Sequence, residues 1–385
     1  MKPYSDVPVL IVGGGPVGLF LACALLTRGI ECVVSEKRPS RALHSRAIGL
    51  HPPGLTALAS VGVADEILRR GVPIRRAQGF FGRSPIGHMS FAETLPPPFD
   101  FALTLPQSET EALLEHRLGE LDPDALRRGE EYIGHRPTDD ALEVSHITPS
   151  GVRTRRVRYL IGCDGGNSRV REQAGIPCRL REYPDRYAMG DFADTSGFGD
   201  EAALFLTPDG ITESFPLPGG MRRWVVHLGG TSDLPESADA LSAEIHRRTG
   251  RAALPETCAM HSRFRVRDRR AARLVAGNVL LAGDAAHVCS PMGGQGMNCG
   301  LIGAARLADA LASALSGRRA ADEAFPEYDR EQRRRARIVA DRAHFNTWMG
   351  RGGPTTTPRA LLMAVLLRTR PTHDLLARVF TMQGL

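Results

Sequence analysis

The stretch Val7-Pro-Val-Leu-Ile-Val-Gly-Gly-Gly-Pro-Val-Gly18 decides the fold. It begins with an apolar run of the kind found in buried strands, and a glycine-rich turn follows. An apolar helix is predicted from Val17 to about Arg28, and a second strand, Cys32–Ser35, leads to the acidic Glu36. Strand, GxGxxG turn, helix, strand and acidic residue together form the fingerprint of a dinucleotide-binding βαβ unit. We therefore expect an α/β fold built on a Rossmann-type domain.

The fingerprint residues have separate expected roles. Gly13 makes the tight turn, Gly15 lets a pyrophosphate approach the backbone, and Gly18 allows the helix to pack closely on the strand. The helix N-terminus would bind the phosphates. Glu36 would bind ribose hydroxyls and repel a 2′-phosphate, so we expect FAD or NAD here and not NADP. The expected cofactor-binding residues of this segment are Gly13, Gly15, Pro16, Val17, Gly18, Glu36 and Lys37.

A second glycine-rich segment lies near the end of the chain. The apolar run 278–282 leads to Gly283-Asp284, and Pro291-Met-Gly-Gly-Gln-Gly-Met-Asn298 precedes a low-charge helix predicted over 297–315. Its glycines would let the backbone approach a flat ligand, and the helix would direct free amides and a positive dipole end at that ligand. Asp284 would accept hydrogen bonds from sugar or polyol hydroxyls.

The composition indicates a globular protein large enough for two domains. The chain has 385 residues, 42% of them hydrophobic, and a net charge of +6. Almost all of the positive charge is arginine, since Lys2 and Lys37 are the only lysines. We expect the cluster Arg333-Arg-Arg335 with Arg337 to lie on the solvated face of a helix, and we expect no nucleic-acid partner.

The sequence predicts no membrane insertion, disulfide or metal site. No run approaches the length of a membrane span, and the apolar residues 16–27 lack the basic flank of a signal peptide. Residues 359–369 could touch a membrane surface, but we expect them to pack against the protein. The seven cysteines include no CxxC pair, which favours free thiols and a cytoplasmic location.

Three motifs, taken in order and spacing, resemble one enzyme family. They are the fingerprint at 13–18, the DGxxSxxR pattern that begins at Asp164, and the pair Gly283-Asp284. Together they resemble the single-component, group A FAD-dependent aromatic hydroxylases, the class typified by para-hydroxybenzoate hydroxylase and the polyketide hydroxylases. Because the motifs are separate and span most of the chain, this resemblance is specific.

The resemblance implies that FAD is bound by residues outside the fingerprint as well. Asp164 and Gly165 would lie beside the pyrophosphate and serve both FAD and NAD(P)H, and Ser168 would join them or cap the short helix that follows. Segments around Arg46 and Gln107 resemble two further FAD-binding segments of the family. The remaining FAD contacts would be Gly283, Asp284, Gly296, Met297 and Asn298.

The implied reaction is hydroxylation of an aromatic or polyketide-type substrate. NADPH or NADH would reduce FAD, O2 would give a flavin C4a-hydroperoxide, and its distal oxygen would pass to an electron-rich ring. The amides near Met297 and Asn298 would stabilise negative charge on the reduced flavin. The residues of the flavin-facing loop would be Pro291, Gly293, Gly294 and Gly296.

The substrate side is expected to have apolar walls, because an aromatic ligand needs them. The candidates are Met189, Phe205, Phe215 and Met292. The base that would activate a phenol is left open between His227 and Arg222. We interpret His287 as a brace of its turn, and a covalent bond from Cys289 to the flavin is disfavoured.

The resemblance implies a Rossmann-type FAD-binding domain, a β-sheet substrate domain and C-terminal helices. The FAD-binding domain would comprise residues 1–75, 106–178 and 276–350, the substrate domain 76–105 and 179–275, and the helical tail 351–385. Larger polyketide hydroxylases carry a further thioredoxin-like C-terminal domain, which we do not expect here. The oligomeric state would be a monomer or a homodimer.

Two alternatives on the same fold stay open, a Baeyer–Villiger-type oxygenase and an FAD-dependent reductase. Flavin-dependent halogenases are excluded, because they depend on an active-site lysine and a WxWxIP motif. Here the lysines are Lys2 and Lys37, and the tryptophans Trp224 and Trp348 are isolated. A flavin-binding protein without activity is disfavoured, because the loops are intact at all three motifs.

Overall fold

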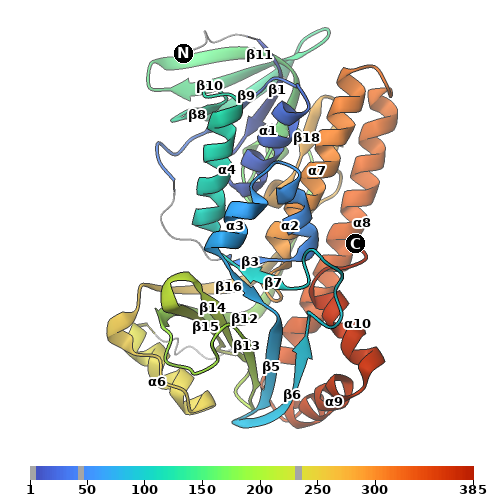
Figure 1. Cartoon of the computed structure of the whole chain (residues 1–385). Coiled ribbons are helices and arrows are strands. Elements are labelled where there is room, and N and C mark those ends of the chain that lie inside the picture. Colours follow the sequence, from blue (N-terminus) through green and yellow to red (C-terminus); the bar gives the residue numbers. More distant parts are fainter. Residues whose placement is uncertain (1–5, 42–46, 230–235) are drawn as a thin grey trace.

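The computed structural model (Figure 1) describes residues 6–41, 47–229 and 236–385. Two large mixed sheets lie one above the other in this view, and helices flank both. The expected α/β fold with a Rossmann-type unit is confirmed.

The first sheet is built around the fingerprint strand. β1 (Val7–Val12) pairs in parallel with β2 (Cys32–Glu36) on one side and with β11 (Gly151–Gly162) on the other. The full strand order is β17-β18-β11-β1-β2-β8, and an antiparallel hairpin extends from β11. The remaining strands are β8 (Leu126–Arg128), β9 (Glu131–Pro137), β10 (Leu142–Thr148), β17 (Val275–Ala276) and β18 (Val279–Leu281).

Helices with buried apolar faces cover this sheet. α1 (Pro16–Thr27) begins one residue before its predicted start and packs against α4 (Gln107–Leu121) and α7 (Gln295–Leu315). α7 in turn packs along α8 (Ala321–Gly350), which runs beside it in Figure 1. The shorter helices on this side are α2 (Pro52–Ala59), α3 (Ala64–Arg70), α5 (Arg169–Gln173) and η3 (Gly283–Ala285).

The second sheet has the order β19-β16-β12-β15-β14-β13-β5-β6. Its strands are β5 (Arg76–Phe81), β6 (Ser84–Ser90), β12 (Cys178–Ala193), β13 (Ala202–Leu206), β14 (Thr212–Leu217), β15 (Met221–His227), β16 (Met260–Ala271) and β19 (His287–Val288). α6 (Ala238–Thr249) covers one face, where Leu241 and Ile245 join a buried aromatic cluster. Alternation of side chains therefore leaves the odd-numbered residues of β14 and β15 on the other face.

Smaller elements connect the two sheets. β3 (Gly49–Leu50), β7 (Ala102–Thr104) and β4 (Val72–Ile74) form a three-stranded sheet. Two one-turn helices, η1 (Pro218–Gly220) and η2 (Pro255–Thr257), lie in loops of the second sheet. The proposed domain boundaries stay a prediction. Two strands pair outside their proposed domains: β19, expected in the FAD-binding domain, pairs with β16, and β7, expected in the substrate domain, pairs with β3 and β4.

The chain ends in two helices, α9 (Thr356–Arg368) and α10 (Arg370–Phe380), beside β6. Three apolar side chains of α9 are exposed, those of Leu361, Leu362 and Val365, so the expectation that this segment packs against the protein is wrong for them. Among the described residues, every helix is too short or too polar to cross a membrane.

The structure places the arginine cluster of α8 and the seven cysteines. In the arginine cluster of α8, Arg333 is exposed as expected, but Arg335 is buried and donates a hydrogen bond to Gln332. A helix with core on one side buries one residue in every turn, and the cluster spans more than one turn. All seven cysteines are free.

Candidate active site

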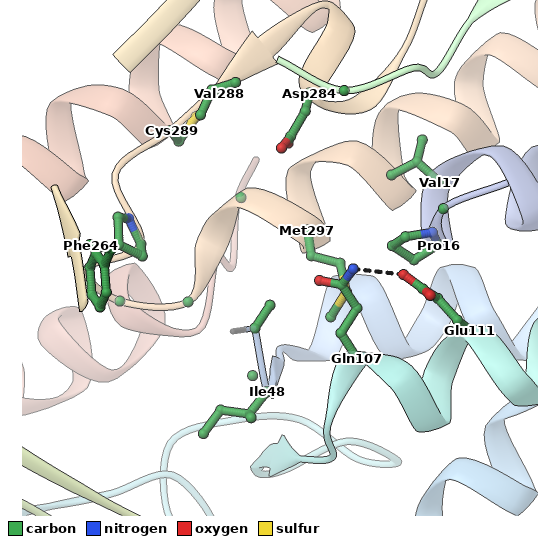
Figure 2. Close-up of a pocket in the computed structure, with 18 of the residues that line it drawn as sticks. Pro16, Val17, Ile48, Gln107, Glu111, Phe264, Asp284, Val288, Cys289 and Met297 are labelled. Carbon is green, nitrogen blue, oxygen red and sulfur yellow. Dashed lines mark hydrogen bonds between the residues drawn. The ribbon is translucent and has the colours of Figure 1, made fainter. Parts of the chain in front are cut away.

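A cavity of about 1170 Å³ joins the two sheets, and most of the predicted site residues line it. Figure 2 shows side chains from α1, α4, α7 and the second sheet converging on this space. Pockets for one small ligand usually occupy about 300–1,000 Å³. The cavity is therefore large enough to hold more than one ligand.

The fingerprint loop forms one end of the cavity. Gly13 has a φ of +111°, and a Cβ added there would lie 2.4 Å from the carbonyl oxygen of Cys163. A Cβ on Gly18 would lie 2.0 Å from the carbonyl oxygen of Gly13, so this residue serves packing and does not line the cavity. At Gly15 an added Cβ would meet no atom of a described residue within 4 Å. The space beside Gly15, at the N-terminus of α1, is thus open to a phosphate group.

Glu36 lines the same end of the cavity, together with Lys37. Its carboxylate accepts hydrogen bonds from the Gly14 amide at 2.7 Å and from the Arg38 amide at 2.9 Å. Burial alone would raise the pKa of Glu36, but these bonds and the Arg38 side chain outweigh it and lower the pKa. Glu36 is therefore an anion fixed at the end of β2, as the ribose role requires.

The DG segment is partly structural. One oxygen of Asp164 accepts hydrogen bonds from the amides of Arg169, at 2.7 Å, and Val170, at 3.1 Å, while its other oxygen is buried and meets no partner among the described residues. Asp164 and Gly165 line the cavity. Ser168 does not. It is fully buried and caps α5 by accepting a hydrogen bond from the Arg171 amide at 2.9 Å, which favours the capping role.

Asp284 points into the middle of the cavity (Figure 2). Desolvation by the surrounding protein raises the pKa of its carboxyl to about 6, although the carboxyl lies open to the cavity. Gly283 lies behind it with a φ of +59°, and a Cβ there would lie 3.1 Å from the Val17 side chain. Arg171 connects this turn to the DG segment, because it donates to the carbonyl oxygens of Gly166 and Ala285.

The loop 291–296 forms the opposite wall. Gly293 and Gly294 have φ values of +94° and +65°, conformations that glycine adopts without strain, and Gly294 is the N-cap of α7. The Nε2 atom of His51 lies 2.8 Å from the Gly293 carbonyl oxygen. The loop residues that line the cavity are Pro291, Met292, Gly293, Gly294, Gly296 and Met297.

Asn298, predicted as a cofactor contact, holds this loop from behind instead. Its side-chain oxygen accepts from the His51 amide at 2.8 Å, and its amide group donates to the carbonyl oxygens of Gly49 and Gly294. The side chain is fully buried and does not line the cavity. The polar atoms of this side chain are therefore bonded to the protein, while the predicted contact through the backbone amides near Met297 and Asn298 stays a prediction.

Gln107 begins α4 and lines the cavity as predicted. Its side-chain amide donates to Glu111 at 2.7 Å, the dashed line in Figure 2, and Glu111 also lines the cavity. Arg46, the other residue predicted from a segment that resembles an FAD-binding segment of the family, lies outside the described residues.

On the substrate side, Met189, Phe215 and Met292 line the cavity, but Phe205 does not. Phe205 lies on the opposite face of the second sheet, where its ring stacks on Phe80 with centroids 4.6 Å apart. The prediction for Phe205 is therefore wrong. Successive residues of a strand point to opposite faces of the sheet, and the preceding residue, Leu204, lines the cavity.

Neither proposed base reaches the cavity. His227 is buried, with its Nε2 atom 3.0 Å from Asp185, and Arg222 is fully buried, with its Nε atom 2.8 Å from Asp194. Each of them contacts a carboxylate at the second sheet and does not line the cavity, so neither candidate touches a ligand held there.

The remaining two candidates behave as expected. His287 is buried away from the cavity, and the side-chain amide of Gln332 lies 2.8 Å from its Nε2 atom, so it braces the turn. Cys289 lines the cavity, but burial raises the pKa of its thiol well above the usual value. A neutral thiol is a poor nucleophile, which agrees with the disfavoured covalent flavin.

Several cavity residues were missed by sequence reasoning. Many of them belong to strands of the second sheet. Packing, and no sequence motif, determines which residues of these strands face the cavity. The sequence did contain one sign of them. Glu213 is acidic, but it occupies the same face of its strand as the apolar residues Ile211 and Phe215. The missed lining residues include His51, Glu111, Tyr132, Arg169, Leu204, Glu213, Arg223, Val225, Phe264, Arg265, Arg267 and Phe380.

A family model described as FAD binding domain matches residues 6–343. The chain belongs to this family. FAD is the cofactor for which the family is named, so the expected cofactor is confirmed, and the open space beside Gly15, the anionic Glu36 and the unpartnered Asp164 oxygen fit it.

Relatives with named activities are similar over most of this chain. An uncharacterised aromatic compound monooxygenase of Bacillus subtilis is 32% identical, covering 82% of this chain and 63% of its own length. The 6-methylpretetramide 4-monooxygenase of Streptomyces rimosus is 32% identical, covering 86% of this chain and 60% of its own length. The chain thus spans less than two thirds of these relatives.

Solved structures support the fold. The p-nitrophenol 4-monooxygenase of Pseudomonas putida superimposes with a TM-score of 0.89 at 23% identity, and the match covers 98% of each chain. At that identity the similarity establishes the fold alone.

Proposed function

We propose that this protein is an FAD-dependent monooxygenase that uses NAD(P)H and O2 to hydroxylate an aromatic or polyketide-type substrate. The observation that carries the proposal is the single cavity, in which the nucleotide-binding motifs and an apolar wall lie together. Gly15, Glu36 and Asp164 form one end, and Met189, Phe215 and Met292 form the other.

Bound FAD would supply the redox chemistry, accepting hydride from NAD(P)H and delivering electrons to O2. The chain's own residues position that cofactor. The N-terminus of α1 at Gly15 would hold the pyrophosphate, Glu36 the ribose and Asp284 a hydroxyl of the linking chain. Because α7 begins at Gln295, its first amides have no helical acceptor, and they would stabilise negative charge on a ring held beside the loop.

The apolar wall would exclude water and hold the substrate ring. The aliphatic and aromatic side chains of Leu204, Phe215, Val225 and Phe264 lie on the same side of the second sheet as Met189. Aromatic ligands bind walls of this kind. Relatives named as an aromatic compound monooxygenase and a 6-methylpretetramide 4-monooxygenase favour hydroxylation over the reaction of a reductase or of a Baeyer–Villiger oxygenase.

Location and assembly are also proposals. The seven free cysteines favour the reducing cytoplasm. Either a monomer or a homodimer accommodates the site, because every lining residue described above comes from one chain.

The test is aerobic oxidation of NADPH and of NADH by the purified, FAD-loaded protein against a panel of phenols and polycyclic quinones. We expect one class of compound to stimulate oxidation and to yield a product heavier by one oxygen atom. Oxidation of NAD(P)H with no change in the mass of any compound would favour the reductase, and failure to retain FAD would overturn the proposal.

A further inference from the structure

We propose that Glu213 is the residue that binds a ring hydroxyl of the substrate and accepts its proton. This inference rests on the proposed function and names a catalytic base for it, together with the substrate feature that the base recognises. It replaces His227 and Arg222, which do not reach the cavity.

Glu213 lies in the centre of the substrate wall. It is on β14, where it pairs with Val225 of β15 and with Leu204 of β13. Val225 in turn pairs across β15 and β12 with Met189. All four residues line the cavity. Their alternation places the carboxyl of Glu213 among the apolar side chains of Leu204, Val225 and Met189.

The same surface contacts the loop that would face the flavin. Met292 of this loop belongs to one apolar cluster with Met189 and Val225. Glu213 is therefore one strand away from side chains that pack with the loop. A ring held between the loop and the sheet would lie within reach of the carboxyl.

The carboxyl of Glu213 meets no partner within the part of the chain that the structure describes. Only 9% of the residue is exposed, and no described residue donates a hydrogen bond to it or forms an ion pair with it. Arg223, on the same face of β15, binds Asp191 through two hydrogen bonds of 2.6 and 2.7 Å. Leaving a buried carboxyl unpaired is costly, so its presence in this wall points to a ligand that supplies the hydrogen-bond donor.

The local environment tunes this carboxyl for proton transfer near neutral pH. Burial raises the pKa of Glu213 to about 7. A base of this pKa is partly ionised at neutral pH and still strong enough to take a proton, the condition for efficient general-base catalysis. Nearby charged and titratable groups on the adjoining strands are Tyr187, Asp191, Arg223 and His227, and Asp185 and Arg351 lie behind His227.

Tyr187 adds a second buried polar group near the first. Its hydroxyl is buried and meets no partner among the described residues, and the negative charge of Glu213 is one of the causes, after burial, that raise the pKa of Tyr187. The hydroxyl is thus close enough to sense the charge of Glu213. Because Tyr187 does not line the cavity, its hydroxyl does not touch the substrate and can act only by positioning Glu213.

The proposed step moves one proton from the substrate to Glu213. The O–H bond of the ring hydroxyl breaks, its proton forms a bond to a carboxylate oxygen of Glu213, and the electron pair stays on the ring oxygen. The resulting phenolate is a stronger nucleophile than the phenol, which favours attack of the ring on an electrophilic oxygen. The proton leaves to water when the product departs.

A binding experiment tests the recognition step without turnover. Naphthol and its methyl ether have the same ring, but only naphthol can donate a hydrogen bond, so their affinities for the FAD-loaded protein are compared by calorimetry in the absence of NAD(P)H. We expect naphthol to bind about tenfold to a hundredfold more tightly, as for a hydrogen bond to a charged acceptor. In Glu213→Leu this preference is expected to vanish. Equal affinities in the wild-type protein, or an undiminished preference in Glu213→Leu, would overturn the proposal.

A kinetic experiment tests the base. Glu213→Gln keeps the size of the side chain but cannot accept the proton. We expect kcat for a phenol to fall by about 10²–10⁴ at neutral pH, with a much smaller change in KM, and to recover as the pH rises and the phenol ionises in solution. Glu120→Gln, an exposed residue of α4, is the control and keeps wild-type values. A loss of activity in Glu213→Gln that is equal at every pH contradicts a base. Because the calorimetry needs no oxygenase activity, failure of the proposed function is distinguishable from failure of this inference.

Discussion

The Nε2 atom of His51 lies 2.8 Å from the carbonyl oxygen of Gly293, a residue 242 positions away in the chain. Burial lowers the pKa of His51 to about 4, so the ring is neutral and its Nε2–H donates to the carbonyl. The bond fixes a loop whose two glycines have left-handed φ values. The shape of this wall of the cavity therefore depends on a side chain from the first part of the chain.

His51→Ala tests that dependence. Removing the donor leaves the Gly293 carbonyl without its partner, which costs about 1–3 kcal/mol of unfolding free energy. We expect weaker FAD retention as well, because the loop would no longer be held. Urea unfolding and the flavin content after gel filtration measure the two effects. His116→Ala, an exposed histidine of α4, is the control. Wild-type flavin content in His51→Ala would show that the loop needs no such brace.

Asp284→Ala is expected to weaken FAD retention and activity together. The Asp284 carboxyl points into the cavity and would bind a hydroxyl of the cofactor. Flavin content and NAD(P)H oxidation are measured on the same preparation. Asp309→Ala, whose target is an exposed residue of α7, controls for loss of a carboxylate. If both quantities stay at the wild-type level in Asp284→Ala, the role of this turn is wrong.

Glu36→Ala is expected to raise the Kd for FAD by about tenfold to a hundredfold, the equivalent of about 1.5–3 kcal/mol for hydrogen bonds to a charged group. The variant also removes the acceptor for the Gly14 amide, which distorts the loop. Glu36→Gln retains one acceptor oxygen and separates the two effects. Titration of the apoprotein with FAD gives the Kd, and unchanged values in both variants would rule out the ribose assignment.

The stability of the protein is expected to fall in acid, partly because of His287. Burial lowers the pKa of His287 from 6.5 to about 4. The unfolded chain therefore binds a proton that the native state excludes, so the stability contributed by this group is present above pH 6.5 and is lost as the pH falls through about 4. The contribution is about 3 kcal/mol. His287→Gln should show a smaller drop in unfolding free energy between neutral pH and about pH 4; a drop as large as that of the wild type would contradict it.

The sequence predicted where the fingerprint residues lie in the fold. Gly13, Gly15 and Glu36 follow a motif whose spacing is dictated by the geometry of a βαβ unit, and their placement was predicted correctly. Ser168 and Asn298 were less predictable. A short polar side chain beside a glycine loop can serve the ligand or the protein, and here both are bonded to backbone groups of the protein.

The residues of the apolar wall could not be predicted from the sequence in the same way. A strand exposes alternate residues to opposite faces, and nothing local says which face meets the cavity. Leu204 and Phe205 are both apolar, so the strand sequence does not show which of them faces the cavity. Phe205 packs into the aromatic cluster beneath α6, and this packing determines the orientation of the strand. Glu213 was detectable in principle, since a carboxyl at a buried alternation position is unusual.

The most direct test of the central claim is turnover under isotopically heavy O2, with the FAD-loaded protein, NAD(P)H and the phenol that most stimulates oxidation. The account predicts that one heavy oxygen atom enters the product and that the label is absent when heavy water replaces heavy O2. A product without label from O2, or no product despite oxidation of NAD(P)H, would contradict a monooxygenase.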